Sequence, residues 1–251
     1  MAVSELRTAL HQLAKVPRLL VALDFDGVLA PIVDVPSAAR PLPEAKAALN
    51  ELATLPDTTV ALVSGRGLAD LAAVSGFAAP IRLVGSHGAE FDDGASAMDD
   101  AAQVRLERLV TDVTALAGHE PGVRLEHKPT GLAVHVRGAD PAVAERVLDA
   151  VRGGPATAEG VVATPGKAVL DLAVVTVSKG SAIDTLREQL GADAVLFAGD
   201  DVTDETGFAR LRDGDVGVKV GDGETAAAFR VADPAAVAGL LQELLAARAT
   251  A

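Results

Sequence analysis

The chain contains no cysteine, tryptophan or tyrosine, and aromatic residues make up only 2% of its 251 residues. The absence of cysteine excludes disulfide bonds, thiolate metal sites and a cysteine nucleophile, and it is typical of proteins in a reducing compartment. Segment 1–17 is predicted to be a charged helix and lacks the basic and then apolar pattern of a secretory signal. We therefore expect a cytoplasmic protein with a core of small aliphatic side chains.

Basic residues and long apolar runs are also scarce. The chain has 22 Lys and Arg against 35 Asp and Glu, which gives a formal net charge of -13 at pH 7. An acidic excess repels nucleic-acid phosphates and anionic lipid headgroups, and no run approaches the roughly 20 apolar residues of a membrane-spanning helix. The sequence predicts neither a nucleic-acid nor a membrane partner, whereas small cations are suitable ligands.

Apolar runs that end in polar or glycine-containing turns dominate the two ends of the chain. They cover residues 19–25, 59–64, 81–86 and 194–199. Nearly continuous apolar strands are typical of a parallel sheet that is covered by helices on both faces. Helical patterns lie between them, for example over 43–55 and 67–75. This alternation predicts an α/β fold with a doubly wound, mostly parallel sheet as its core.

The middle of the chain follows a different pattern. It predicts, in order, a helix over 95–116, a hairpin of strands 123–127 and 132–137, a helix over 141–151 and a strand over 168–174. The parallel pattern resumes with a helix over 179–190 and ends with a helix over 235–247. We therefore expect a discontinuous core, 1–92 and 175–251, with an inserted α+β cap domain at 93–174.

Two carboxylates, Asp24 and Asp26, stand at the end of the first apolar run and precede a glycine. Alternate residues of a strand point the same way, and like charges this close require a cation. An oxygen-ligated ion such as Mg2+ suits them and usually brings a phosphate group with it. The alternative is an ordinary acidic turn that closes a strand.

A second acidic cluster, at 199–205, follows the last apolar run. The carboxyl ends of parallel strands share one edge of the sheet, so Asp200 and Asp204 can meet Asp24 around a single ion. Helix capping with Thr203 as the N-cap is the alternative. Capping accounts poorly for Asp200 and Asp201, because acids crowded at one sheet edge destabilise an acidic protein without a cation.

Two further positions favour an anion. Ser64 and Arg66 follow the second apolar run at a predicted helix start, where backbone N–H groups favour negative charge, although Ser64 is equally suited to cap the helix. Lys179 opens the helix after the insert, which is an unfavourable place for a cation unless an anion recruits it. A solvated surface lysine is the alternative.

These elements, in this order, resemble the haloacid-dehalogenase-like hydrolase superfamily, whose core is Rossmann-like. A longer set of strings resembles the trehalose-6-phosphate phosphatase family: LDFDG (23–27), VSGR (63–66), GSHGAE (85–90), LEHK (125–128), AVHVR (133–137) and GDDVTDE (199–205). The resemblance covers nearly the whole chain and implies Mg2+-dependent hydrolysis of trehalose 6-phosphate through an aspartyl-phosphate.

The resemblance also implies a role for each catalytic position. Asp24 is the expected nucleophile, and Asp26 is the expected general acid and base. Mg2+ is expected to be held by Asp24, by the backbone carbonyl of Asp26 and by Asp200, while Asp204 orients metal-bound water. Ser64 and Lys179 are expected to bind the transferring phosphoryl group, with Arg66 in the same turn.

In this family the cap supplies specificity. Glu126 and Lys128 alternate on one predicted strand, so both face the same side and are expected to bind sugar hydroxyls, together with Asp171 on a later strand. An ion pair between Glu126 and Lys128 is the alternative. Asp171 stands where the family usually has a Glu-x-x-Pro pattern, and the chain has Ser86 where the family usually has Leu.

These departures leave another sugar or polyol phosphate, such as glucosylglycerol phosphate or sucrose phosphate, as the alternative substrate. Two further hypotheses are a non-catalytic domain that senses a sugar phosphate and a mutase, and no degenerate catalytic position supports the first. The expected partners are a small-molecule sugar phosphate and a trehalose-phosphate synthase of the same pathway. We expect a monomer.

Overall fold

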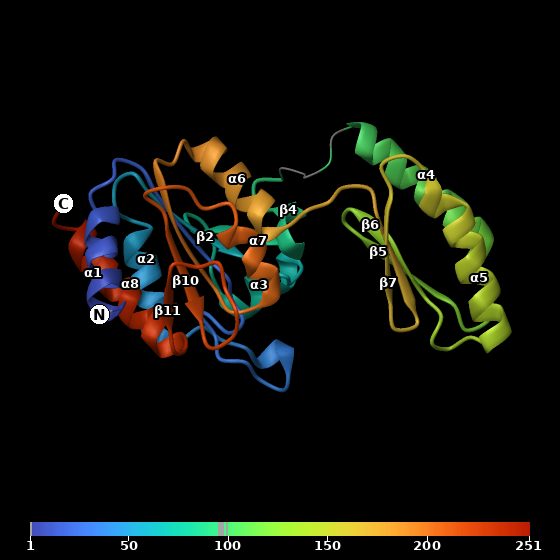
Figure 1. The fold of residues 1–251 in the computed structure, drawn as a ribbon, viewed down its shortest axis with the longest axis horizontal. Helices are drawn as coiled ribbons and strands as arrows, with labels where there is room; N and C mark the ends of the chain where they lie inside the picture. Colours follow the sequence, from blue (N-terminus) through green and yellow to red (C-terminus); the bar gives the residue numbers. More distant parts are fainter. Residues whose placement is uncertain (1, 95–97, 99) are drawn as a thin grey trace. The chain divides into compact units, whose positions relative to one another are not determined.

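The structure is a computed structural model that describes residues 2–94, 98 and 100–251 (Figure 1). The chain forms two compact units, one of residues 1–95 and 177–251 and the other of residues 96–176. The boundaries between the units, at 95/96 and 176/177, lie three and two residues after the predicted boundaries at 92/93 and 174/175. That the second unit acts as a cap domain stays a prediction, and the start of the helix predicted over 95–116 lies outside the described residues.

The larger unit is built on one mostly parallel sheet. Its strands are, in spatial order, β11 (Phe229–Val231), β10 (Val216–Val220), β9 (Ala194–Gly199), β1 (Leu19–Leu23), β2 (Thr58–Val63), β3 (Arg82–Gly85) and β4 (Glu90–Phe91). Neighbours pair in parallel except β3 and β4. The chain adds β2 and β3 on one side of β1 and the later strands on the other, which confirms the doubly wound fold. The strand order reverses between β1 and β9, and such switch points bind ligands.

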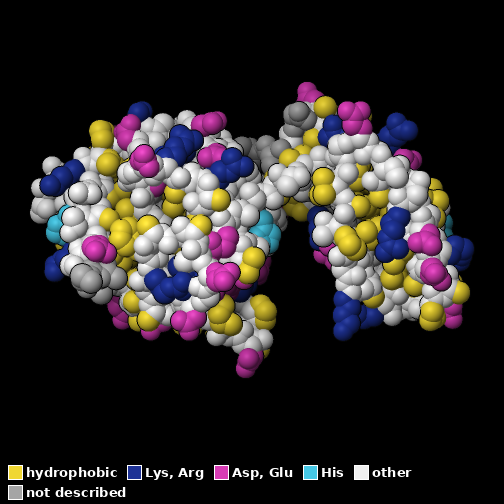
Figure 2. Space-filling model, viewed as in Figure 1, with side chains coloured by type: hydrophobic (Ala, Val, Ile, Leu, Met, Phe, Trp, Pro, Cys, Tyr) yellow, Lys and Arg dark blue, Asp and Glu magenta, His cyan; other side chains and the backbone are white. Residues whose placement is uncertain are grey.

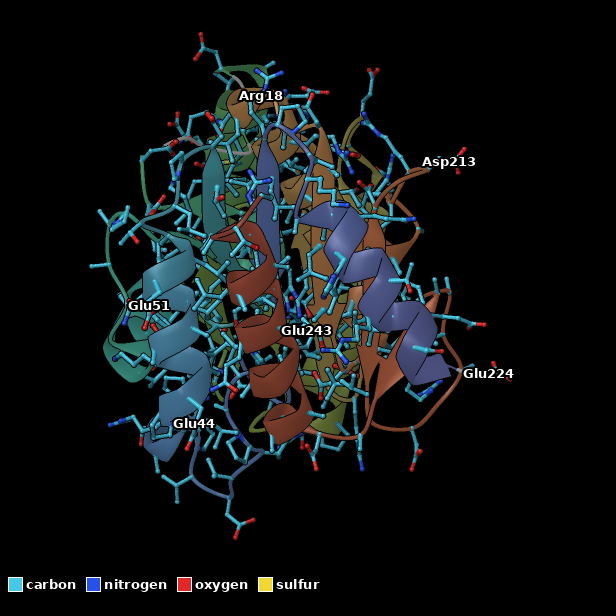
Figure 3. The ribbon with its side chains drawn as sticks, turned by 90° about the vertical axis from the view of Figure 1, so that its left-hand side faces the viewer. Arg18, Glu44, Glu51, Asp213, Glu224 and Glu243 are labelled. Carbon is cyan, nitrogen blue, oxygen red and sulfur yellow. The ribbon has the colours of Figure 1, made fainter. Side chains whose placement is uncertain are left out.

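Helices cover both faces of this sheet, which explains the continuous apolar runs. One apolar layer receives α1 (Ala2–Leu13), α2 (Pro43–Leu52), α3 (Leu68–Ser75) and α8 (Pro234–Arg248), and the other receives α6 (Lys179–Leu190) and α7 (Glu205–Phe208). Figure 3 shows α1, α8 and α2 side by side over the sheet, with Glu243 of α8 between α8 and α1. There Glu243 forms an ion pair with Arg7 at 2.5 Å.

The smaller unit is an antiparallel sheet with helices packed on one face. Its strands are, in spatial order, β5 (Arg124–Lys128), β6 (Gly131–His135), β8 (Val169–Ala173) and β7 (Val162–Gly166). Leu132, Val134, Leu170 and Leu172 form its apolar layer with residues of α4 (Asp100–Ala117) and α5 (Pro141–Gly153). Side chains alternate along strands, so the opposite face carries the polar residues of β5 and β8.

Within the residues described, no helix is long and apolar enough to cross a membrane. Figure 2 shows Asp and Glu side chains interspersed with Lys and Arg over the visible face of each unit. Neither sign of charge dominates that visible face.

Candidate active site

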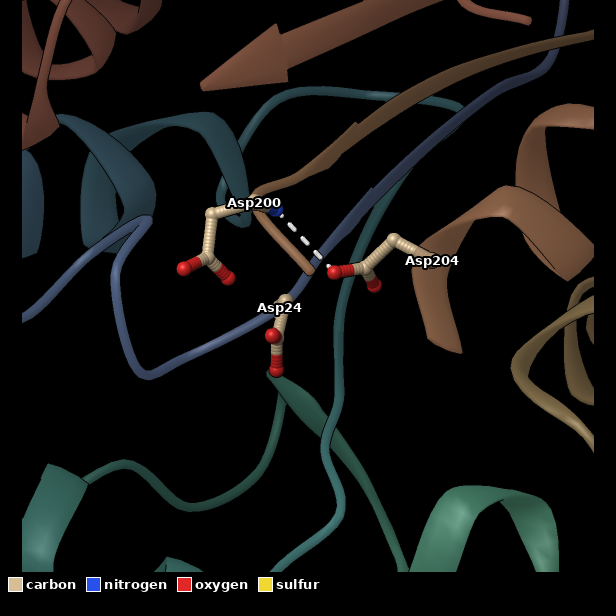
Figure 4. Close-up of side chains that lie close together, drawn as sticks. All are labelled: Asp24, Asp200 and Asp204. Atoms are coloured by element: carbon tan, nitrogen blue, oxygen red, sulfur yellow. Dashed lines mark hydrogen bonds between the residues drawn. The ribbon is translucent and has the colours of Figure 1, made fainter. Parts of the chain in front are cut away.

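Three carboxylates meet at the switch point of the larger sheet. Asp24 follows β1, Asp200 follows β9, and Asp204 ends the short 3-10 helix η4 (Val202–Asp204). Their oxygens lie within 4.8 Å of one another (Figure 4). The Asp24 amide donates to the Ala198 carbonyl at 3.0 Å, so the parallel pairing of β1 with β9 itself brings the acids together.

Asp204 is the structural centre of this cluster and is fully buried. Its Oδ2 accepts the backbone N–H groups of Asp200 and Asp201, both at 3.0 Å, and Figure 4 shows the first of these bonds. Asp201, and not Thr203, is the N-cap of η4, because its carboxylate accepts the Val202 amide at 2.7 Å. The alternative of a Thr203 cap is therefore wrong, and so is the expectation that capping does not explain Asp201, because Asp201 is the cap.

Lys179 neutralises part of this charge. Its side chain is 2% exposed, and its Nζ lies 2.8 Å from Asp24 Oδ2 and 2.8 Å from Asp204 Oδ1. The anions that favour a lysine at the start of α6 are therefore the carboxylates of Asp24 and Asp204. Asp24 Oδ1 in turn accepts the Phe25 amide at 2.7 Å, so both oxygens of Asp24 are oriented.

Burial raises the pKa of two of the carboxylates, Asp24 and Asp200. Burial raises the pKa of Asp24 from 3.8 to about 7; the charge of Lys179 opposes this effect and that of Asp204 adds to it. Burial, followed by the charge of Asp204, raises the pKa of Asp200 to about 6. Without a compensating cation, buried like charges hold protons.

The cluster fits a hard divalent cation. Its donors are carboxylate oxygens, the ligands that Mg2+ prefers. No donor among the described residues reaches the Asp200 carboxylate, so that group has free ligand capacity. Gly27 adopts φ +73°, and a Cβ there would lie 2.0 Å from Asp200 Oδ2. The glycine therefore serves both the turn after β1 and the close approach of Asp200.

The turn after β2 carries Ser64 and Arg66. Ser64 is 1% exposed, and its Oγ accepts the Arg66 amide at 3.2 Å. Helix α3 begins at Leu68 with Gly67 as its N-cap, so Ser64 is not the cap. Ser64 faces the cleft that the acids line.

Arg66 binds carboxylates of the protein itself. Its guanidinium contacts both oxygens of Asp26, at 2.6 and 2.8 Å, and Asp70 at 2.8 Å. The hydrogen bonds that Arg66 donates to Asp26 raise the pKa of Arg66. The Asp26 carboxylate is accordingly held by Arg66 and is not one of the three clustered groups.

A cleft of about 570 Å³ connects these residues. Its lining includes Asp24, Asp26, Ser64, Arg66, Lys179 and Asp200. The structure thus brings together the site residues that the sequence predicts for the core. His87, to which sequence reasoning assigned no role, lies on the same wall, and it and Ser86 have φ of 56° and 49°.

The predicted substrate residues of the smaller unit share one face of its sheet. Glu126 pairs in register with Ala133, which pairs with Asp171. Lys128 forms an ion pair with Asp171, whereas Glu126 Oε2 lies 2.8 Å from His135 Nε2 and 3.3 Å from the Arg124 guanidinium. Glu126 and Lys128 therefore have different partners, and the ion pair between them that was the alternative does not form.

Two polar residues escaped the sequence reasoning. His135 pairs in register with Arg124 and contacts Glu126 diagonally across the β5–β6 pair, and its alternation with Arg137 was the available signal. Lys219 is buried at 4% exposure within the apolar strand β10, and its Nζ donates to the main-chain carbonyl of Asp200. A lysine inside the run VGVKV was the signal there, since lysine is rarely buried without a reason.

Comparisons with known proteins identify similar chains. A trehalose-phosphate phosphatase of Mycobacterium ulcerans is 37% identical over 256 residues, which cover 94% of this chain and 65% of that protein. A bifunctional trehalose-6-phosphate synthase/phosphatase of Thermoproteus tenax is 34% identical over 92% of this chain and 32% of its own length. The chain thus spans about 65% of the M. ulcerans relative.

A solved structure is similar over nearly the whole chain. The trehalose-6-phosphate phosphatase of Aspergillus fumigatus superposes with a TM-score of 0.72 at 28% identity, and the match covers 96% of this chain and 97% of that one. Residues 22–235 match the trehalose-phosphatase family. This match includes both acidic clusters, Ser64, Lys179 and the whole smaller unit, and the chain belongs to the trehalose-phosphatase family.

Proposed function

We propose that the protein is a Mg2+-dependent phosphatase that hydrolyses trehalose 6-phosphate to trehalose and phosphate. The observation that carries the proposal is the buried Asp24 carboxylate, which is oriented by Lys179 and Phe25 and lies beside Asp200 and Asp204 in an open cleft. Membership of the trehalose-phosphatase family and the names of the relatives support the substrate.

In the first step an oxygen of Asp24 bonds to phosphorus as the bond from phosphorus to the sugar oxygen breaks. Asp26 supplies the proton that the departing sugar oxygen takes up. Water then attacks the aspartyl-phosphate, Asp26 accepts the proton of that water, and phosphate leaves. Because Arg66 holds both oxygens of the Asp26 carboxylate, Asp26 must part from Arg66 and take up a proton from solvent before it can donate to the leaving group.

Asp24, Asp200 and the backbone carbonyl of Asp26 are the proposed holders of Mg2+, with Asp204 orienting the water bound to it. When bound, Mg2+ offsets negative charge on the phosphoryl group. Lys179 contributes a further positive charge from inside the cleft, and Ser64 donates a hydrogen bond to a phosphoryl oxygen.

The polar face of the smaller unit is the proposed sugar-binding surface. Glu126, Lys128 and Asp171 offer carboxylate acceptors and ammonium donors, which suit hydroxyl groups of a disaccharide. A related sugar or polyol phosphate remains the competing substrate, because the hydroxyl pattern accepted depends on how Asp171 is placed. A site whose polar groups hydrogen-bond one pattern of sugar hydroxyls binds a different pattern more weakly, because some of those polar groups are then left without a partner.

We further propose a monomeric, cytoplasmic enzyme that receives its substrate from a trehalose-phosphate synthase. One relative is a bifunctional synthase/phosphatase, which supports this source of the substrate. The protein's charge of -13 disfavours polyanionic partners.

The proposed mechanism is tested by Asp24→Asn, which keeps the shape of the side chain and removes the nucleophile. Phosphate release from trehalose 6-phosphate in saturating Mg2+ should fall by at least about a thousandfold, because the variant lacks the carboxylate that is proposed to attack phosphorus. Circular dichroism should show an unchanged fold. Turnover near the wild-type rate in the folded variant would remove Asp24 from the mechanism.

A further inference from the structure

Lys219 is a buried cation that the proposed mechanism does not use. It lies in β10, whose residues are all buried, and is itself 4% exposed. Lysine is rarely buried without a partner, because removing an ammonium group from water is costly. Among the residues that the structure describes, its hydrogen-bond partner is the main-chain carbonyl oxygen of Asp200, and it forms no ion pair with a carboxylate.

The sheet places this lysine beside the metal-binding loop. Lys219 pairs in register with Gly199, the last residue of β9 and the neighbour of Asp200. A side chain at Gly199 would clash, since a Cβ there would lie 2.3 Å from Asp204 Cγ. The start of the loop is therefore tightly packed, with Asp204 and Lys219 both reaching its backbone.

The contacts from Asp204 and Lys219 hold the backbone N–H and the backbone C=O of the same residue, Asp200. The N–H of Asp200 donates to Asp204 Oδ2 at 3.0 Å, and the C=O of Asp200 accepts from Lys219. With both of its backbone polar groups held, Asp200 has little freedom to rotate. Its carboxylate stays close to Gly27 and within reach of Asp24.

The charge of Lys219 matters as well as its hydrogen bond. A neutral donor would satisfy a carbonyl oxygen, whereas an ammonium group also offsets the negative charge of Asp200, adding to the larger effect of Lys179. Lys179 forms ion pairs with Asp24 and Asp204, and its ammonium group does not pair with Asp200 in the described part of the chain. Lys219 holds the remaining member of the cluster.

We propose that Lys219 is a positioning residue that presents Asp200 to Mg2+ and thereby sets the affinity of the site for the metal. This inference rests on the proposed function, which assigns Mg2+ to the cluster. It predicts that Mg2+ binding weakens when Lys219 is replaced, although Lys219 is not itself a ligand.

The test compares Mg2+ binding to the whole protein, measured by isothermal titration calorimetry, for the wild type, Lys219→Met and Lys219→Gln. Both variants lack the charge, and Gln keeps a polar donor, so at least one of them is expected to fold. The Kd for Mg2+ should rise by about tenfold or more, the usual effect of losing a group that orients a metal ligand. The increase in Tm on adding Mg2+ should shrink in parallel.

Lys46→Met is the matched control, because Lys46 also donates to main-chain carbonyls, those of Ser75 and Gly76, in the same unit. It should leave the Kd for Mg2+ unchanged. A folded Lys219 variant with the wild-type Kd, even with a lower Tm, would overturn the inference. Failure of the wild type to bind Mg2+ would instead contradict the proposed function, so the two failures are distinguishable.

Discussion

Asp24 and Asp200 combine a proposed ligand role with pKa values raised by burial, to about 7 and about 6. In the metal-free protein these raised values mean that the folded state binds protons more tightly than the unfolded state between about pH 4 and 7. The contribution of these carboxyls to stability therefore decreases as the pH rises through that range. A bound cation replaces the protons and removes this cost.

Mg2+ affinity should consequently depend on pH. Protons compete for Asp24 and Asp200 at about pH 5.5 and have mostly left both at about pH 7.5, so the Kd should fall by roughly tenfold or more across this range. Calorimetry in buffers of different ionisation enthalpy should also detect proton release on binding. A Kd that stays constant over this pH range would contradict the protonation of these two carboxyls.

The sequence predicted the site residues only where a local pattern carries the information. An acidic residue that directly follows an apolar strand indicates the sheet edge, and this placed Asp24 and Asp200 correctly beside each other. The partner of Arg66 could not be predicted, because Asp26 lies 40 residues away and no periodicity links them. The partner of Lys219 could not be predicted for the same reason, since the contact crosses from β10 to the end of β9, although the lysine within the apolar run VGVKV was itself a local signal.

At the level of elements, the turn between β1 and the following loop depends on Gly27. Gly27→Ala should raise the Kd for Mg2+, because the added Cβ meets Asp200 Oδ2 at 2.0 Å and φ is +73°. We expect a loss of roughly 1–3 kcal/mol in the free energy of unfolding, the cost of a strained left-handed residue. Chemical denaturation and Mg2+ titration measure the two effects.

Gly94→Ala separates the two causes. Gly94 has a similar φ of +77°, but a Cβ there meets nothing within 4 Å. Gly94→Ala should lose only the part of the free energy of unfolding that a strained left-handed residue costs, and it should keep the wild-type Kd for Mg2+. An equal loss of Mg2+ affinity in both variants would show that the contact with Asp200 is unimportant.

The sheet of the smaller unit supports a second prediction at this scale. Asp171→Ala removes the partner of Lys128 and a proposed sugar ligand, so kcat/KM for trehalose 6-phosphate should fall by about tenfold or more, mainly through KM. Hydrolysis of p-nitrophenyl phosphate, which has no sugar, should be unchanged. Asp149→Ala, which breaks an exposed pair with Arg152 in the same unit, is the matched control. Equal losses on both substrates would contradict a role of Asp171 in sugar recognition.

The sequence predicted some elements better than others for physical reasons. Strands β1, β2, β3 and β9 are long apolar runs between turns, and these were found. Strand β7 escaped prediction because all of its residues are exposed and it contains Pro165. Strand β11 is only three residues long. Edge strands bury little surface, so their sequences carry little hydrophobic pattern.

On the scale of the whole molecule, the proposed chemistry and the proposed sugar recognition belong to different units. The larger unit contains the carboxylate cluster and its cleft, and the smaller unit contains the polar sheet face. Each unit has its own apolar core. If the polar face binds the sugar as proposed, substitutions there should change the substrate preference and leave Asp24 and its neighbours in place.

The central claim is tested most directly by phosphate release from trehalose 6-phosphate, glucose 6-phosphate, sucrose 6-phosphate, glucosylglycerol phosphate and p-nitrophenyl phosphate, each with Mg2+ or with EDTA. We predict the highest kcat/KM for trehalose 6-phosphate and loss of release in EDTA, since Mg2+ is required. Equal kcat/KM for the several sugar phosphates, or undiminished release in EDTA, would contradict a dedicated, metal-dependent trehalose 6-phosphate phosphatase.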